Sequence, residues 1–180
     1  MTSAAVPAEL LERIRRVELV LVDNDGVMTD GRLIYGDHGD EIKFFDVQDG
    51  FGMVMLRRAA LKTVILSARK SRLNDRRAKE LQVMKLYQNA FDKSKVFQKI
   101  LKKFKVSPEQ VCYVGDDLID IPVLKRVGFA VAVQNARLEV KKEVHWVTEH
   151  SGGRGALREL AELILKTQGK WADVTARYYL

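Results

Sequence analysis

The sequence has few cysteines and prolines and no long apolar run, and each shortage excludes a class of protein. Cys112 is the only cysteine among the 180 residues, so a disulfide cannot form within the chain. With three prolines and no Gly- or Ser-rich stretch, the chain lacks a linker that would divide it into domains. No apolar run approaches the roughly 20 residues that cross a bilayer, and residues 1–16 lack the basic-then-apolar order of a signal peptide. We therefore expect a single domain over residues 1–180, located in the cytoplasm.

The cysteine and the histidines offer little chemistry. Cys112 lies in the apolar run VCYVGDD, which favours a small buried strand residue over a nucleophile. The three histidines, His38, His145 and His150, do not have the spacing of metal ligands. We expect none of the four to be catalytic.

The chain carries an excess of positive charge, with 31 basic against 24 acidic residues and a formal net charge of +7. Two interpretations compete, namely nucleic-acid binding and a basic enzyme that attracts an anionic substrate. Aromatic residues make up only 8% of the chain, and none alternate with the basic clusters to form a stacking platform. The composition therefore favours an anionic small molecule as partner, with no nucleic acid and no membrane.

Apolar runs typical of buried strands alternate with helical patterns. The predicted strands cover residues 18–23, 62–67, 83–87, 111–117, 128–133 and 143–148. The predicted helices cover about 8–16, 50–60, 71–81, 93–105, 118–127 and 154–167. This alternation predicts an α/β fold with a doubly wound parallel sheet. Ligands of such sheets bind at the carboxyl ends of the strands, so polar residues there are the candidates for function.

One segment, about residues 31–46, departs from this alternation. The runs RLIY and EIKFF flank the turn sequence GDHGD, which predicts a β-hairpin that projects from the sheet edge. Its apolar residues are Leu33, Ile34, Tyr35, Ile42, Phe44 and Phe45. An exposed apolar patch usually marks an interface, although the hairpin could also fold back on its own sheet.

The strongest chemical pattern is Asp23-Asn24-Asp25-Gly26 at the end of the first strand. A carboxylate at Asp23 can attack phosphorus and form an aspartyl-phosphate, and a second carboxyl at Asp25 can protonate the leaving oxygen. The one-residue spacer puts both carboxyls on the same side of an extended chain. Taken alone, two acids at this spacing favour a polar turn about as much as catalysis.

A second acidic cluster follows another apolar strand, in Gly115-Asp116-Asp117-Leu118-Ile119-Asp120. Mg²⁺ binds a few carboxylates together with water and phosphate oxygens, so Asp116 facing Asp23 would form a magnesium site. The alternative is an N-capped helix start, for which three acids in six residues are more than capping requires.

Two single residues complete the pattern. Ser67 ends the run VILS, where its hydroxyl could hold a phosphoryl oxygen, and Lys93 opens a helix, where its ammonium could offset phosphate charge. Each alone is more often a turn serine or a solvated lysine.

In this order, DNDG, Ser67, Lys93 and GDDLID resemble the haloacid dehalogenase superfamily of phosphatases, which has a Rossmann-like sheet. The resemblance implies that Asp23 is the nucleophile and Asp25 the general acid/base. It also implies that Ser67 and Lys93 bind the phosphate.

The same resemblance implies a metal site. Asp23, the Asp25 carbonyl and Asp116 would hold Mg²⁺. Asp117 and Asp120 would support the site, with Asp120 orienting Lys93.

A narrower likeness runs from about residue 15 to 170. The motifs DGVMTDGRLIY, VQDGFGM, SARKS, VGDDLIDIPV, VAVQNA and SGGRGALREL resemble the family of 3-deoxy-D-manno-octulosonate 8-phosphate (KDO 8-phosphate) phosphatases. That resemblance implies hydrolysis of KDO 8-phosphate to KDO and phosphate in lipopolysaccharide precursor synthesis. It implies no cap domain, a homotetramer built on the hairpins with a neighbour closing each site, and Arg69 and Arg154 as substrate-binding residues.

The sequence departs from this family at two positions. Asn24 stands where an apolar or small residue is common, and we expect its side chain to point away from the acids. Ala68 replaces a frequent glycine, which makes the sugar preference less firm than the reaction. The tail, about 169–180, is expected to be disordered or to dock near a neighbouring site.

Three alternatives remain. A nine-carbon sugar acid 9-phosphate, of 2-keto-3-deoxynononic acid or N-acylneuraminate, shares the carboxylate and the terminal phosphate. A non-catalytic tetramerisation module would have no need to retain all of Asp23, Asp25, Ser67, Lys93 and Asp116. Nucleic-acid binding would require a salt-sensitive affinity.

Overall fold

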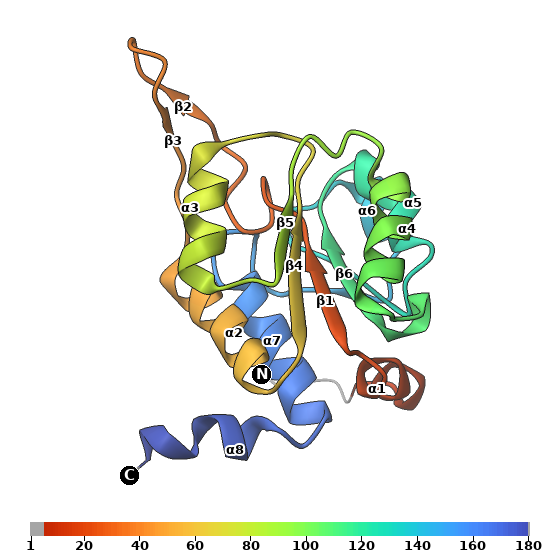
Figure 1. Cartoon of the computed structure of the whole chain (residues 1–180). Coiled ribbons are helices and arrows are strands. Elements are labelled where there is room, and N and C mark those ends of the chain that lie inside the picture. The colour runs from red at the N-terminus through yellow and green to blue at the C-terminus, as the bar shows by residue number, and fades with distance from the viewer. Residues whose placement is uncertain (1–5, 180) are drawn as a thin grey trace.

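The computed structural model describes residues 6–179 and has a six-stranded sheet at its centre (Figure 1). The strand order is β5-β4-β1-β6-β7-β8, and every neighbouring pair is parallel. The strands are β1 (Leu19–Val22), β4 (Lys62–Leu66), β5 (Lys85–Tyr87), β6 (Val111–Gly115), β7 (Phe129–Ala132) and β8 (Trp146–Val147). Every residue of β1, β6 and β7 is buried, as expected of strands covered on both faces.

Helices cover both faces of this sheet (Figure 1). They are α1 (Ala8–Arg15), α2 (Val47–Arg58), α3 (Arg72–Leu81), α4 (Lys93–Phe104), α5 (Ile121–Leu124), α6 (Leu138–Lys141), α7 (Ala156–Thr167) and α8 (Trp171–Thr175). On one face α2 packs along α7 and against α3, while α4 and α5 pack together on the other. The predicted doubly wound α/β fold is therefore confirmed, with no separate cap domain among the described residues.

Side-chain caps start the helices that follow the loops at the sheet edge. The Asp46 carboxylate accepts from two backbone N–H groups of the first turn of α2. Ser71 caps α3 through the Leu73 N–H, and Asp92 caps α4 through the Lys95 N–H. Such caps satisfy N–H groups that have no partner inside the helix. Because Asp92 sets the start of α4, Lys93 enters that helix at its first residue.

The hairpin consists of β2 (Ile34–Tyr35) and β3 (Glu41–Ile42), which pair antiparallel and project from the body (Figure 1). Ile34, Tyr35, Ile42 and Phe44 are exposed. Phe45 instead packs against the core and forms a β-bridge with Thr29. The base of the hairpin is therefore attached to the loop that follows β1.

One predicted helix differs in the structure, and two short helices are additional. The helix expected over 118–127 is a 3-10 turn, Leu118–Asp120, followed by α5, because Pro122 at the start of α5 lacks the N–H that a continuous helix requires. The short helices α6 and α8 were not expected. Within residues 6–179, none of the helices combines the length and apolarity that crossing a bilayer requires.

The tail after α8 packs against α2 of the same chain. Residues Ala176–Tyr178 form a 3-10 turn after α8. The Tyr178 ring meets the edge of Phe51 at a centroid distance of 5.6 Å, and its hydroxyl accepts from Arg58. For the residues described, the contacts with Phe51 and Arg58 hold the tail against α2.

Candidate active site

The loop after β1 brings two carboxylates to the carboxyl edge of the sheet. The Asp23 N–H extends the ladder by bonding the Val114 carbonyl at 3.0 Å. The chain then turns at Gly26, whose φ of +97° is a left-handed conformation that favours glycine. The Thr29 hydroxyl accepts from the N–H groups of Gly26 and Gly31 and closes the turn. Asp23 and Asp25 consequently leave the sheet at the same point.

Asp116 reaches this point from β6, the neighbour of β1. Its carboxylate lies so close to the loop that a Cβ added at Gly26 would stand 2.1 Å from Asp116 Oδ2. Oxygens of Asp23, Asp116 and Asp120 all lie within 4.8 Å of one another. The structure therefore brings the two predicted acidic clusters together.

Asp120 is fully occupied by hydrogen bonds. Its Oδ1 accepts from Lys93 Nζ at 2.6 Å and from the Tyr113 hydroxyl at 2.5 Å. Its Oδ2 accepts from the N–H groups of Asp116 and Asp117 at 2.9 and 3.1 Å. Since both oxygens are used, Asp120 orients its neighbours, and Asp23 and Asp116 remain the carboxylates free to bind a cation.

Lys93 lies between two of these acids. Its Nζ donates to Asp23 Oδ1 at 2.7 Å and to Asp120, and its side chain is 1% exposed. Burial opposes the charge of the ammonium, but the two carboxylates outweigh burial and raise the pKa of Lys93. The contact between Lys93 and Asp120 is the one expected from the resemblance.

The two remaining carboxylates repel each other in this buried setting. Burial raises the pKa of Asp23 to about 7, with a further rise from Asp120 and an opposing effect of Lys93. Burial, followed by Asp23 and Asp120, raises the pKa of Asp116 to about 8. A hard divalent cation would offset this repulsion, and carboxylate and carbonyl oxygens are the ligands that Mg²⁺ prefers. The donor set therefore fits magnesium.

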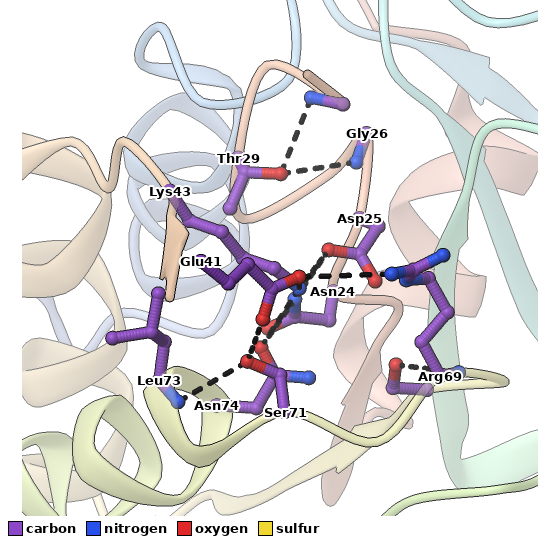
Figure 2. A network of polar contacts seen from close by, with 12 residues as sticks. Asn24, Asp25, Gly26, Thr29, Glu41, Lys43, Arg69, Ser71, Leu73 and Asn74 are labelled. Carbon is purple, nitrogen blue, oxygen red and sulfur yellow. Dashed lines mark hydrogen bonds and ion pairs between the residues drawn. The ribbon is translucent and has the colours of Figure 1, made fainter. Parts of the chain in front are cut away.

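A small pocket of about 180 Å³ opens over these groups. Its lining residues are Asp23, Asp25, Ser67, Ala68, Arg69, Asp116, Asp117 and Ile119. The Ser67 hydroxyl accepts from the Arg69 N–H at 3.2 Å. The Arg69 guanidinium points toward the hairpin, where it donates to the Tyr35 hydroxyl at 2.9 Å. It also lies 3.7 Å from Glu41 (Figure 2).

Arg154 is a predicted substrate-binding residue that does not line this pocket. Its guanidinium lies 3.8 Å from Asp30. It lines a larger hollow of about 740 Å³, which contains neither Asp23 nor Asp116. The loop that carries Arg154 nevertheless supports the site, because Gly153 N–H bonds the Val27 carbonyl at 2.9 Å.

Lys43 and Asn74 lie beside Asp25 although neither was predicted as a site residue, and the Asn24 side chain points in a direction that was not predicted. Lys43 Nζ donates to Asp25 Oδ1 at 2.5 Å, and the Asn24 amide donates to Asp25 and to Asn74 at 3.0 Å each (Figure 2). The expectation that Asn24 points away from the acids is wrong, because the turn directs its amide beside Asp25. Side chains alternate along the run EIKFF, so Lys43 shares a face with Phe45 and not with Phe44. This alternation could have indicated that Lys43 points toward the body of the protein.

Cys112, His145 and His150 make contacts that stabilise the fold and lie outside the pocket. Cys112 is fully buried in β6, and burial raises the pKa of its thiol. His145 Nδ1 accepts from the Ala130 N–H at 2.9 Å. His150 Nδ1 lies 2.8 Å from Glu159, which raises the pKa of the imidazole. None of these residues lines the pocket over Asp23.

Comparisons with known proteins agree with this geometry. The model of the haloacid dehalogenase-like hydrolase family matches residues 53–160. The chain is 39% identical over 170 residues to 3-deoxy-D-manno-octulosonate 8-phosphate phosphatase KdsC of Yersinia pestis, covering 94% of this chain and 91% of the relative. The relative of the same name from Escherichia coli K12 is 39% identical over 165 residues, covering 92% of this chain and 88% of its own.

Solved structures show the same similarity. The 3-deoxy-D-manno-octulosonate 8-phosphate phosphatase of Moraxella catarrhalis, in complex with magnesium, phosphate and KDO, superposes with a TM-score of 0.92 at 34% identity, covering 94% of this chain and 98% of that one. The Yersinia pestis phosphatase superposes with a TM-score of 0.89 at 40% identity, covering 91% and 88%. The chain therefore belongs to the haloacid dehalogenase-like hydrolase family, as a phosphatase similar to the KDO 8-phosphate phosphatases.

Proposed function

We propose that this chain hydrolyses KDO 8-phosphate to KDO and inorganic phosphate through an aspartyl-phosphate, in lipopolysaccharide precursor synthesis. The observation that carries the proposal is the contact between Asp23, which lines the pocket, and the buried Lys93, with Asp116 beside Asp23. The similarity to a relative that binds magnesium, phosphate and KDO supports the choice of sugar. The reaction would take place in the cytoplasm, in a single domain spanning residues 1–180.

The first half-reaction is phosphoryl transfer to Asp23. Since Lys93 binds Asp23 Oδ1, the other oxygen is free to attack phosphorus. The bond from phosphorus to the sugar oxygen breaks, and Asp25 donates a proton to that oxygen. The Ser67 hydroxyl and the Lys93 ammonium would hold the transferred phosphoryl oxygens.

The second half-reaction is hydrolysis of the aspartyl-phosphate. Asp25, now deprotonated, takes a proton from a water molecule, whose oxygen attacks phosphorus. The acyl-phosphate bond breaks, which releases phosphate and restores the Asp23 carboxylate. Asp23, Asp116 and the Asp25 carbonyl would hold Mg²⁺, which when bound offsets the charge of the carboxylates and the phosphate.

Assembly is a separate part of the proposal. Ile34, Tyr35, Ile42 and Phe44 are exposed on a hairpin that stands away from the core (Figure 1). An apolar surface of this kind favours burial against other copies. We propose a homotetramer formed through the hairpins, in which a neighbouring subunit closes each pocket and Arg69 and Arg154 contact the substrate.

The experiment that tests the function is a phosphate-release screen over sugar-acid phosphates, with Mg²⁺ and with a chelator. We expect the highest kcat/KM for KDO 8-phosphate, since discrimination between substrates resides in that ratio. A preference for a nine-carbon acid 9-phosphate would replace the sugar and keep the chemistry. Absence of turnover on every phosphate with Mg²⁺ present would favour a non-catalytic module instead.

A further inference from the structure

Lys43 is a buried lysine that the two half-reactions above do not use. It lies between β3 and the bridge of Phe45 to Thr29, and its side chain is 0% exposed. Burying an ammonium is costly unless acceptors surround it. Its Nζ donates to Asp25 Oδ1 at 2.5 Å and to Asn74 Oδ1 at 3.2 Å, and it lies 3.7 Å from Glu41 Oε1 (Figure 2). The segment that follows β3 and carries Lys43, here called the hairpin arm, thus brings a charged group into contact with Asp25.

The hydrogen bonds of Asp25 are all on one oxygen. Oδ1 accepts from Lys43 and also from the Asn24 amide at 3.0 Å. Among residues 6–179, no group donates to Oδ2, while the residue lines the pocket beside Asp23. The carboxyl is therefore held by one oxygen and presents the other to the substrate.

The groups that hold Oδ1 are themselves fixed by contacts from three elements. Asn74 is fully buried in α3 and accepts from both the Asn24 amide and Lys43. The Asn74 amide in turn donates to Gln88, beyond β5, at 3.2 Å. The arm that carries Lys43 is anchored by Phe45, over whose ring the Arg77 guanidinium stands 5.5 Å from the centroid. A side chain held from several elements loses little entropy when the substrate binds.

We propose that Lys43 is a positioning residue: by binding Asp25 Oδ1 it keeps Oδ2 facing the leaving oxygen of the phosphate ester. The inference rests on the proposed role of Asp25 in proton transfer. General acid catalysis requires hydrogen-bond reach to the proton acceptor, and a small misplacement of such a group costs about 10²-fold in rate. Lys43 does not touch the substrate and acts through Asp25.

Leaving-group dependence distinguishes positioning of Asp25 from general damage. An alkoxide leaving group, as in a sugar phosphate, needs protonation, whereas 2,4-dinitrophenolate leaves without it. In Lys43→Met, we expect single-turnover formation of the aspartyl-phosphate from a sugar phosphate to slow by about 10²-fold, with KM little changed. With 2,4-dinitrophenyl phosphate the same step should slow by less than about 3-fold, since Asp25 is dispensable there.

Further variants keep the test decisive. Lys43→Arg retains a donor and should recover part of the loss. Lys43→Met should add nothing in an Asp25→Asn background, because residues that act as a unit are not additive. If Lys43→Met does not fold, Asn24→Ala removes the other donor to Oδ1 and should give the same leaving-group signature. Lys62→Met is the matched control, since Lys62 pairs with Glu18 away from the pocket.

Three outcomes are possible, and they separate this inference from the proposed function. A selective loss on the sugar phosphate supports the role of Lys43. An equal loss on both substrates, or an additive loss in the Asp25→Asn background, overturns it. A wild-type chain that releases phosphate from neither substrate would overturn the proposed function, and with it the role of Asp25 on which the inference rests.

Discussion

Lys93 Nζ and Asp23 Oδ1 are joined by a 2.7 Å hydrogen bond across 70 residues of sequence, and both side chains are almost completely buried. The pair is stable because Asp120 supplies a second negative partner to the same ammonium. A buried charge with its partner removed is costly, so each member of this trio depends on the other two. The arrangement combines the carboxylate that we propose as nucleophile, an ammonium beside it and a second carboxylate that holds the ammonium.

Asp23→Asn should abolish turnover with little effect on the fold. The amide has nearly the same shape but cannot attack phosphorus, so we expect kcat to fall by more than about 10³-fold. Phosphate release under saturating substrate measures the loss, and circular dichroism checks the fold. Turnover at the wild-type rate would show that another group is the nucleophile.

Lys93→Met should destabilise the protein strongly, in addition to impairing turnover. It leaves Asp23 and Asp120 buried without a cation, which costs about 3–5 kcal/mol. Urea unfolding in chelator measures the change in the free energy of unfolding. Lys95→Met is the control, because Lys95 is an exposed neighbour that pairs with Asp92 across one helical turn. A loss below about 1 kcal/mol, as for a surface pair, would contradict the buried trio.

The stability of chelator-treated protein should fall as pH rises. Asp23 and Asp116 have pKa values near 7 and 8 when folded, against 3.8 as the ordinary value, so the folded chain binds more protons between these limits. The free energy of unfolding is therefore greatest below about pH 4 for these two groups and declines toward pH 8. Saturating Mg²⁺ should flatten the decline, because the cation replaces the protons. Urea titrations across pH test this, and a decline unchanged by Mg²⁺ would argue against the metal site.

Gly26→Ala should weaken activation by Mg²⁺. The added Cβ would stand 2.1 Å from Asp116 Oδ2, at a φ of +97°, so the carboxylate must move. We expect about 10- to 100-fold weaker Mg²⁺ activation, the usual effect of disturbing the support of a metal ligand. Gly39→Ala is the matched control, since Gly39 has a φ of +77° but nothing within 4 Å of its added Cβ. Equal Mg²⁺ dependence in both variants would contradict a collision with Asp116.

Ile42→Glu together with Phe44→Glu should dissociate the proposed tetramer. Both side chains are exposed on the hairpin, and a charge there opposes burial against another copy. Light scattering after gel filtration should give the mass of a smaller species. Met84→Glu, an exposed apolar position outside the hairpin, should leave the mass unchanged. A wild-type chain that already runs as a monomer would contradict the assembly.

The sequence by itself determined the fold class and the order in which the candidate site residues follow the strands. Continuous apolar runs ending in Asp23, Ser67 and Asp116 required a parallel sheet, and parallel strands collect their carboxyl ends at one edge. The spacing of Asp23 and Asp25 and the position of Lys93 at a helix start are local features, so they were readable without coordinates.

Only the tertiary structure decided which side chains share contacts. Lys43 and Asn74 are distant in sequence from Asp25. The alternation around Lys43 indicates which face of the strand it occupies, but only the packing of the hairpin arm and α3 against the loop after β1 brings both residues to Asp25. Packing also directed Arg154 toward Asp30, away from the pocket over Asp23. Residue types and spacing set the chemistry that is possible, whereas long-range packing sets which oxygen of each carboxylate remains free to perform it.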